Sequence, residues 1–167
     1  MSLAAEMAMA MRGHEEIFRY WKSLKKRAHL PARADLDPAQ IRRRLPTISL
    51  VDVLEPTDGH NPRAYRQRLA GTELFSIYGK EITGLTLEDI YGQAEGNYWA
   101  RELADIVVSK KPNVGLQSME WCGSKGLYLF WLRLPLASDG VNVDMVLGHD
   151  AYIGRSDVGM NTGIRAA

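Results

Sequence analysis

One apolar run, GLYLFWLRLPLA at residues 126–137, constrains the fold more than any other feature of the sequence. Side chains in a strand alternate between the two faces of a sheet, and in this run both faces are apolar. The two sets are Leu127, Leu129 and Trp131, and Tyr128, Phe130, Leu132 and Leu134. A strand of this kind is covered on both faces. We therefore expect helices to cover one face, and an N-terminal helix or a second protomer to cover the other.

Residues 5–28 are predicted to form that N-terminal helix, because their apolar side chains recur at helical spacing. Ile17, Trp21 and Leu24 lie on this stripe, and we expect them to form a helix contact or a dimer contact. After Pro31, Asp37 is a predicted N-cap with Pro38 at the first position of a short helix that ends at Pro46.

The rest of the chain predicts an α+β fold, with strands on both sides of a helical block. A five-stranded antiparallel sheet, with helices on one face and the amphipathic N-terminal helix, satisfies the pattern. The predicted strands are 48–54, 63–71, 113–122, 126–137 and 143–152, and the predicted helices between them are 72–79, 86–92 and 93–111. We divide the chain into an N-terminal extension and connector (1–46), a core (47–153) and a C-terminal tail (154–167).

The stretch RLAGTELFSIYGKEITG, residues 68–84, contains three glycines that do not match a phosphate-binding loop. Gly71 ends a strand, and Thr72 is the predicted N-cap of the next helix. Gly79 suits the left-handed position after that helix, and Gly84 suits a tight turn. Arg68 has no role in backbone geometry, and we expect it to anchor the helical block by hydrogen bonds.

Side chains that carry out catalysis or bind metals are not grouped in the sequence. The four histidines and the single cysteine, Cys122, form no close pair, which argues against a zinc site. Glu88 and Asp89 are adjacent and therefore diverge on a helix, so we interpret them as cap or solvent residues. His149 lies on a predicted strand and is either a pocket residue or a core or edge histidine.

Aromatic side chains from the predicted sheet and its covering helices are the remaining signal. They line a small-molecule cavity or fill the core. The candidate pocket residues are Tyr65, Tyr78, Tyr98, Trp99, Trp121, Trp131 and His149.

Charge is unevenly distributed along the chain. Residues 1–47 hold ten Lys or Arg and five Asp or Glu, although the net charge of the whole chain is +1. The basic segments are 22–27 and 42–44; they form a solvated face or contact nucleic acid or an acidic partner. The single cysteine and the lack of a long apolar run predict a cytoplasmic protein with no membrane span.

Several short motifs, in order, resemble the bacterial stand-alone PAS-like proteins (PAS_5-type), which are mostly alphaproteobacterial. An N-terminal helix with Trp21 is followed by Leu-Pro at 30–31, Asp-Pro at 37–38 and Leu-Pro at 45–46. An Arg-x-x-Gly-Thr motif at 68–72 and a Gly-x-x-Ile-Thr-Gly motif at 79–84, which includes Thr83, complete the pattern.

The resemblance implies a PAS fold with strand order 2-1-5-4-3 and a non-enzymatic sensory role. It also implies a homodimer formed through the N-terminal helix, a small-molecule ligand, and a separate signalling protein as partner. The flavin-binding Asn-Cys-Arg-Phe motif and a histidine on the long helix are both missing, which argues against flavin and haem. The alternatives are a small cavity-bearing enzyme that uses His149 or Asp150, and nucleic-acid binding through the basic N-terminal region.

Overall fold

The computed structural model describes residues 1–54 and 60–154. Most of the segment predicted as a turn (55–62) and of the predicted tail (154–167) lies outside the described residues. The helices are α1 (Leu3–Leu24), α2 (Thr72–Tyr78) and α3 (Leu87–Ser109), with short 3-10 segments η1 (Arg33–Asp35), η2 (Pro38–Thr47), η3 (Pro62–Ala64) and η4 (Glu120–Cys122). The strands are β1 (Ile48–Val53), β2 (Tyr65–Ala70), β3 (Asn113–Ser118), β4 (Tyr128–Leu136) and β5 (Met145–Ile153).

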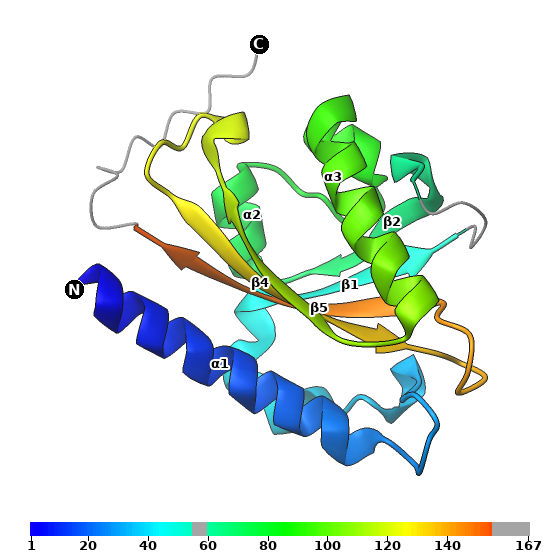
Figure 1. The fold of residues 1–167 in the computed structure, drawn as a ribbon. Coiled ribbons are helices and arrows are strands. Elements are labelled where there is room, and N and C mark those ends of the chain that lie inside the picture. The colour runs from blue at the N-terminus through cyan, green and yellow to red at the C-terminus, as the bar shows by residue number, and fades with distance from the viewer. Residues whose placement is uncertain (55–59, 155–167) are drawn as a thin grey trace.

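The five strands form one antiparallel sheet in the order β2-β1-β5-β4-β3, which confirms the predicted topology. Figure 1 shows α2 and α3 over one face of the sheet, here called the inner face, and α1 across the other, the outer face. Strands β1, β5 and β4 therefore lie between two helical layers. This arrangement explains the apolar character of both faces of β4, where Leu129, Trp131 and Leu134 are all fully buried.

The cover of the outer face comes from the same chain. Ile17 and Trp21 lie on the side of α1 that faces the sheet and are buried. The Trp21 indole Nε1–H donates to the Pro135 carbonyl oxygen of β4 at 2.9 Å. Leu24 is partly buried in the same layer. The contact that we predicted for these three residues is therefore intramolecular in this structure. The helix ends at Leu24, earlier than predicted, because Lys25 is extended.

The glycines of residues 68–84 occupy backbone positions that suit glycine, as predicted, but the N-cap of α2 differs from the prediction. The N-cap of α2 is Gly71, and Thr72 is the first helical residue. A Cβ atom at position 71 would overlap the carbonyl oxygens of Leu45 and Pro46, so only glycine fits where the chain enters the helix. Gly79 has a φ of 67° and occupies the predicted left-handed C-cap.

The second half of this stretch runs beside β2. The Gly84 amide donates to the Gln67 carbonyl oxygen at 2.7 Å, and Gly84 has a φ of +87°. The backbone amide of Thr83 donates to the Glu81 carboxylate at 2.9 Å. Arg68 is exposed, and its side chain forms no hydrogen bond with any residue in the described part of the chain. No hydrogen bond among the described residues therefore supports the predicted anchoring role of Arg68.

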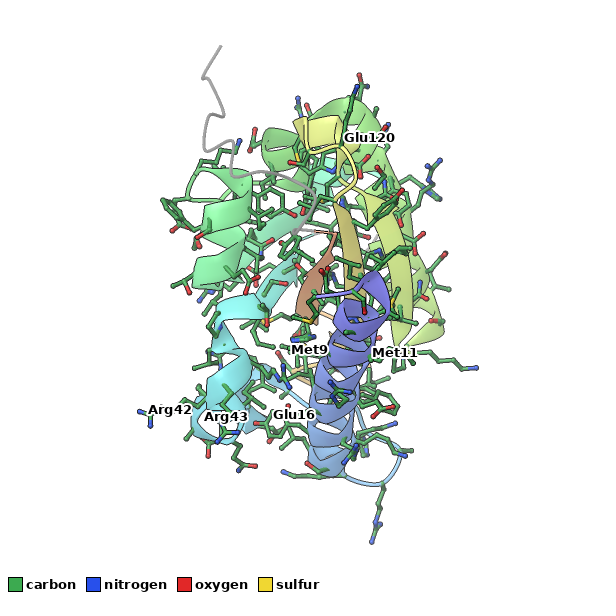
Figure 2. The ribbon with its side chains drawn as sticks, turned by 90° about the vertical axis from the view of Figure 1, so that its left-hand side faces the viewer. Met9, Met11, Glu16, Arg42, Arg43 and Glu120 are labelled. Carbon is green, nitrogen blue, oxygen red and sulfur yellow. The ribbon has the colours of Figure 1, made fainter. Side chains whose placement is uncertain are left out.

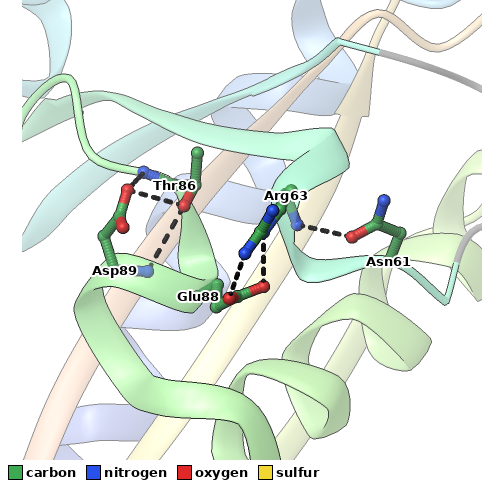
Figure 3. Close-up of polar contacts among 5 residues, drawn as sticks. All are labelled: Asn61, Arg63, Thr86, Glu88 and Asp89. Carbon is green, nitrogen blue, oxygen red and sulfur yellow. Dashed lines mark hydrogen bonds and ion pairs between the residues drawn. The ribbon is translucent and has the colours of Figure 1, made fainter.

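Helix α3 contains the two helices predicted for residues 86–111, joined at Gly92, which has a non-helical φ of 75°. Thr86 and Asp89 form a capping box at its start, as Figure 3 shows. Glu88 accepts two hydrogen bonds from the Arg63 guanidinium, which ties α3 to η3 (Figure 3). Asp89 thus has the capping role predicted for it, whereas Glu88, predicted to be a cap or solvent residue, forms an ion pair with Arg63.

Candidate functional site

A buried ion pair lies on the inner face of the sheet, where β4 and β5 adjoin. Arg133 Nη1 donates to Asp150 Oδ1 at 2.6 Å, and the two residues are only 5% and 1% exposed. Arg133 Nη1 also donates to the Leu132 carbonyl oxygen at 3.0 Å. Burial of two charges is costly unless they pair with good geometry. This pair is therefore the most demanding polar feature of the core.

Aromatic rings surround the ion pair. The Arg133 guanidinium carbon lies 5.0 Å from the ring centroid of Trp99 and 5.8 Å from that of Trp131, within the range of cation–π attraction. Burial acts to lower the pKa of Arg133, but the charge and hydrogen bond of Asp150 outweigh it and raise the pKa above its ordinary value. The guanidinium therefore stays charged inside the core.

The rings continue into an aromatic cluster on the inner side of the sheet, in which neighbouring centroids lie 5.1 to 6.0 Å apart. Its members are Tyr78, Tyr91, Tyr98, Trp99, Trp121 and Trp131. The Tyr78 and Tyr91 hydroxyls are hydrogen-bonded at 3.1 Å, and burial raises the pKa of Tyr91 to about 12. Both tyrosines are therefore neutral hydrogen-bonding groups at ordinary pH.

Three polar atoms near the ion pair are buried and have no partner among the described residues. They are the indole nitrogens of Trp99 and Trp131 and the Tyr152 hydroxyl oxygen. The space enclosed by Ser49, Gln67, Trp99 and the ion pair is about 10 Å³, enough for roughly one water molecule. In this conformation, side chains fill the interior between the sheet and the helices.

A second buried polar pair lies on the outer face, under α1. The Nδ1 atoms of His14 and His149 are 2.7 Å apart, so one imidazole donates a hydrogen and the other accepts it. Burial lowers the pKa of His14 to about 4 and that of His149 to about 3, and the charges of Arg44 and Arg133 act in the same direction. Both rings are therefore neutral at ordinary pH. His14 is only 6% exposed, although it lies on the helix that covers the sheet from outside.

The helix approaches the sheet closely at this pair because of Gly13. A Cβ atom at Gly13 would lie 2.9 Å from His149 Cε1 and 3.2 Å from Arg44 Nη1. The Phe130 ring lies against His14, with a centroid separation of 4.4 Å. The docking of α1 on β5 thus depends on a small residue and one short hydrogen bond.

The structure brings together most of the predicted pocket residues, although whether they bind a ligand stays a prediction. Tyr78, Tyr98, Trp99, Trp121 and Trp131 all join the aromatic cluster. Tyr65 is buried at the start of β2. His149 lies on the opposite face, and so it does not share their site.

Sequence reasoning missed Arg133, Tyr91, Tyr152 and the partner of His149. A signal for Arg133 was available, since an arginine between Leu132 and Leu134 in a doubly buried strand requires a buried carboxylate. Asp150 is that carboxylate. The enzyme alternative named His149 or Asp150, which are neighbours on β5 and face opposite sides of the sheet. Asp150 is paired with Arg133, and His149 with His14.

Two hollows flank the N-terminal half of α1. One, of about 340 Å³, lies between α1, η2 and β5 and includes Met9; the other, of about 350 Å³, lies between α1 and the β3–β4 edge and includes Met11. Figure 2 shows Met9 and Met11 on the two flanks of the helix. Within residues 1–54 and 60–154, no group of three or more metal-binding side chains occurs, and no helix is long and apolar enough to cross a membrane.

The basic segments lie on α1, on the turn that follows it, and on η2. Arg42 and Arg43 are exposed, and Figure 2 shows them on the outer side of η2. Arg44 points inward and forms an ion pair with Glu16 of α1 at 2.7 Å. Part of this positive charge is therefore used to hold η2 against α1.

Comparison with known proteins identifies the family. The family model described as "PAS domain" matches residues 9–150. The PAS domain of Bordetella pertussis BvgS has a similar fold, with a TM-score of 0.50 and 14% identity over 74% of this chain and 92% of that one. A PAS domain from Colwellia psychrerythraea gives a TM-score of 0.48 and 13% identity over 71% and 99% of the two chains. No curated protein matches. Because the family model spans most of the chain and the sheet has the expected strand order, the protein belongs to the PAS domain family.

Proposed function

We propose that the protein is a non-enzymatic sensory module in which a change at the Arg133–Asp150 pair passes through β5 to α1. The observation that supports this proposal most directly is the placement of two consecutive residues on β5. Asp150 holds Arg133 on the inner face, and His149 holds His14 of α1 on the outer face. A single strand thus connects the interior to the helix that covers the sheet.

The physical argument depends on how tightly both ends are fixed. Strand β5 is hydrogen-bonded to β4 along its length and to β1 from Met145 to His149, so it moves with little freedom of its own. A ligand that draws Asp150 away from Arg133 displaces the backbone that also carries His149. The imidazole pair and Gly13 leave no room for that displacement without a shift of α1. A ligand has this effect only if it binds one arrangement more tightly than the other.

The output of the module would be a contact made by α1. Ile17 and Trp21 are already buried in the same chain, so they are not available to a partner in this arrangement. Met9 and Met11 are each 51% exposed on the flanks of the helix. We propose that a second copy of the chain or a separate signalling protein contacts this region, and that a shift of α1 alters the contact.

Amide hydrogen exchange of the Asp150→Asn variant tests the coupling. This substitution keeps the side-chain shape but removes the charge that balances Arg133. We expect exchange in α1 around His14 to accelerate at least about tenfold more than exchange in α3, because local opening follows the coupled element.

An Ile106→Val variant serves as the matched control, because it weakens the core within α3 without touching the ion pair. It should accelerate exchange without singling out α1. Equal acceleration in α1 and α3 of the Asp150→Asn variant would show that the substitution lowers overall stability only, and the proposed coupling would be wrong.

A further inference from the structure

The hollow between α1, η2 and β5 lies at a free edge of the sheet. Strand β1 pairs with β5 only as far as His149, whose partner is Ile48. From Asp150 to Ile153, β5 pairs with β4 alone. The 340 Å³ hollow occupies this position, and four consecutive residues of β5, His149 to Tyr152, contribute to its lining. Its volume falls within the range of small-molecule sites.

Asp150 connects this hollow to the interior. It lines both the hollow and the small space beside Arg133 and Trp99. Its Oδ1 accepts the hydrogen bond from Arg133, whereas no hydrogen bond recorded within the described residues uses Oδ2. One carboxylate oxygen is therefore left for another donor.

Tyr152 supplies a second polar group without a partner. The residue is 92% buried and lines the same hollow, and its hydroxyl has no hydrogen-bond partner among the described residues. Asp150 and Tyr152 are two residues apart on β5, so both side chains leave the inner face of the strand. The hollow lies at the edge that β1 leaves open, and Glu73 of α2, on the inner side, also lines it. A buried hydroxyl without a partner is costly, which makes this end of the hollow receptive to a hydrogen-bonding ligand.

We propose that this hollow binds a small neutral molecule with an apolar body and a hydroxyl group, an alcohol or a phenol. A ligand hydroxyl can donate to Asp150 Oδ2 and accept from the Tyr152 hydroxyl at the same time, so it pairs with both groups. Met9, Ala10 and Ala151 supply apolar wall for the rest of the molecule. This inference deepens the proposed function, and it rests on that function only for the biological role of the ligand.

Charged head groups fit the same position less well. A carboxylate would face the Asp150 carboxylate and would be repelled by it. An ammonium group could donate to Asp150, but it would place a second cation beside the Arg133 guanidinium. Asp150 and Arg133 already neutralise each other, so a neutral donor adds no unbalanced charge beside this pair. Glu6, Arg44 and Glu73 also line the hollow, and Arg44 is paired with Glu16.

A series of four one-ring probes tests the ligand class on the full chain by NMR titration. Phenol carries the hydroxyl, anisole has an ether oxygen in its place and no donor, and benzylamine and benzoate carry opposite charges. We expect phenol to shift the amide signals of Ala151 and Tyr152 with a dissociation constant in the millimolar range, as suits so small a probe. Anisole, benzylamine and benzoate should each bind at least about tenfold more weakly.

Tyr152→Phe is the informative variant, because it removes only the hydroxyl without a partner. It should weaken phenol binding about tenfold and leave anisole binding unchanged. Tyr91→Phe is the matched control, since the Tyr91 hydroxyl is bonded to Tyr78 on the inner side; it should bind phenol like the wild type.

Three results would overturn the proposal: equal binding of phenol and anisole, no shift at Ala151 and Tyr152, or a Tyr152→Phe variant that binds phenol as tightly as the wild type. If Tyr152→Phe does not fold, the probe series on the wild type still decides the question. Phenol binding without any change in α1 exchange would support the site and count against the coupling. If the Asp150→Asn variant accelerates exchange selectively in α1 but the wild type does not bind phenol, the coupling is supported and the proposed site is wrong.

Discussion

Mild acid should destabilise this protein through the His14–His149 pair. Both imidazoles have a pKa of 6.5 when unfolded, and in the fold burial lowers these values to about 4 and about 3. The unfolded chain therefore binds more protons than the folded one whenever the pH lies below about 6.5. The stabilisation is complete above that pH and is lost as the pH falls toward the folded values.

The magnitude follows from these pKa values. Between pH 7 and pH 5, linkage gives a loss of about 2 kcal/mol for each histidine. The two sites share a hydrogen bond, so we expect about 3 to 4 kcal/mol for the pair. Total folding free energies are about 5 to 15 kcal/mol, so this loss should be easy to detect.

Urea denaturation at a series of pH values measures the effect directly. The double variant His14→Leu/His149→Leu replaces both partners with apolar side chains and should lose most of the pH slope. His60→Gln, at an exposed position, is the matched control and should keep the slope of the wild type. A wild-type protein whose stability changes by less than about 1 kcal/mol over this range, or a double variant with an unchanged slope, would refute the argument.

Three further substitutions test other parts of the structure, each by denaturation of the purified variant. Gly71→Ala should cost at least about 1 to 3 kcal/mol, because the new Cβ atom meets backbone oxygens that cannot move aside; a neutral result would contradict the close approach. Arg133→Met should cost about 3 to 5 kcal/mol, because it leaves Asp150 buried and unpaired, and Arg133→Met/Asp150→Leu should recover most of the loss. Thr86→Ala should cost about 0.5 to 2 kcal/mol through the lost cap, whereas Arg63→Gln should cost less because its ion pair is exposed; the reverse order would refute this ranking.

The sequence by itself determined the layers of this protein. The apolar residues on both faces of 126–137 predict a strand that is covered twice, and the resemblance to PAS-like proteins implies the order of the strands. Caps and glycines have local causes, so the ends of several helices could also be read from the sequence. Gly71 shows the limit of this reasoning: its φ is −65°, an ordinary value, and only the nearby carbonyl oxygens of Leu45 and Pro46 explain why glycine is needed.

Only the tertiary structure decided which polar side chains meet. His14 and His149 are 135 positions apart, and their contact depends on where α1 crosses β5. Arg133 and Asp150 meet because the β4–β5 register places Trp131 opposite Asp150 and Arg133 opposite Gly148. The spacing of apolar residues along a strand or helix fixes the face on which each side chain lies. It does not fix the register between neighbouring strands or the position at which a helix docks on the sheet. The consecutive residues His149 and Asp150 therefore have partners on opposite faces of the sheet, and this arrangement is the basis of the function that we propose.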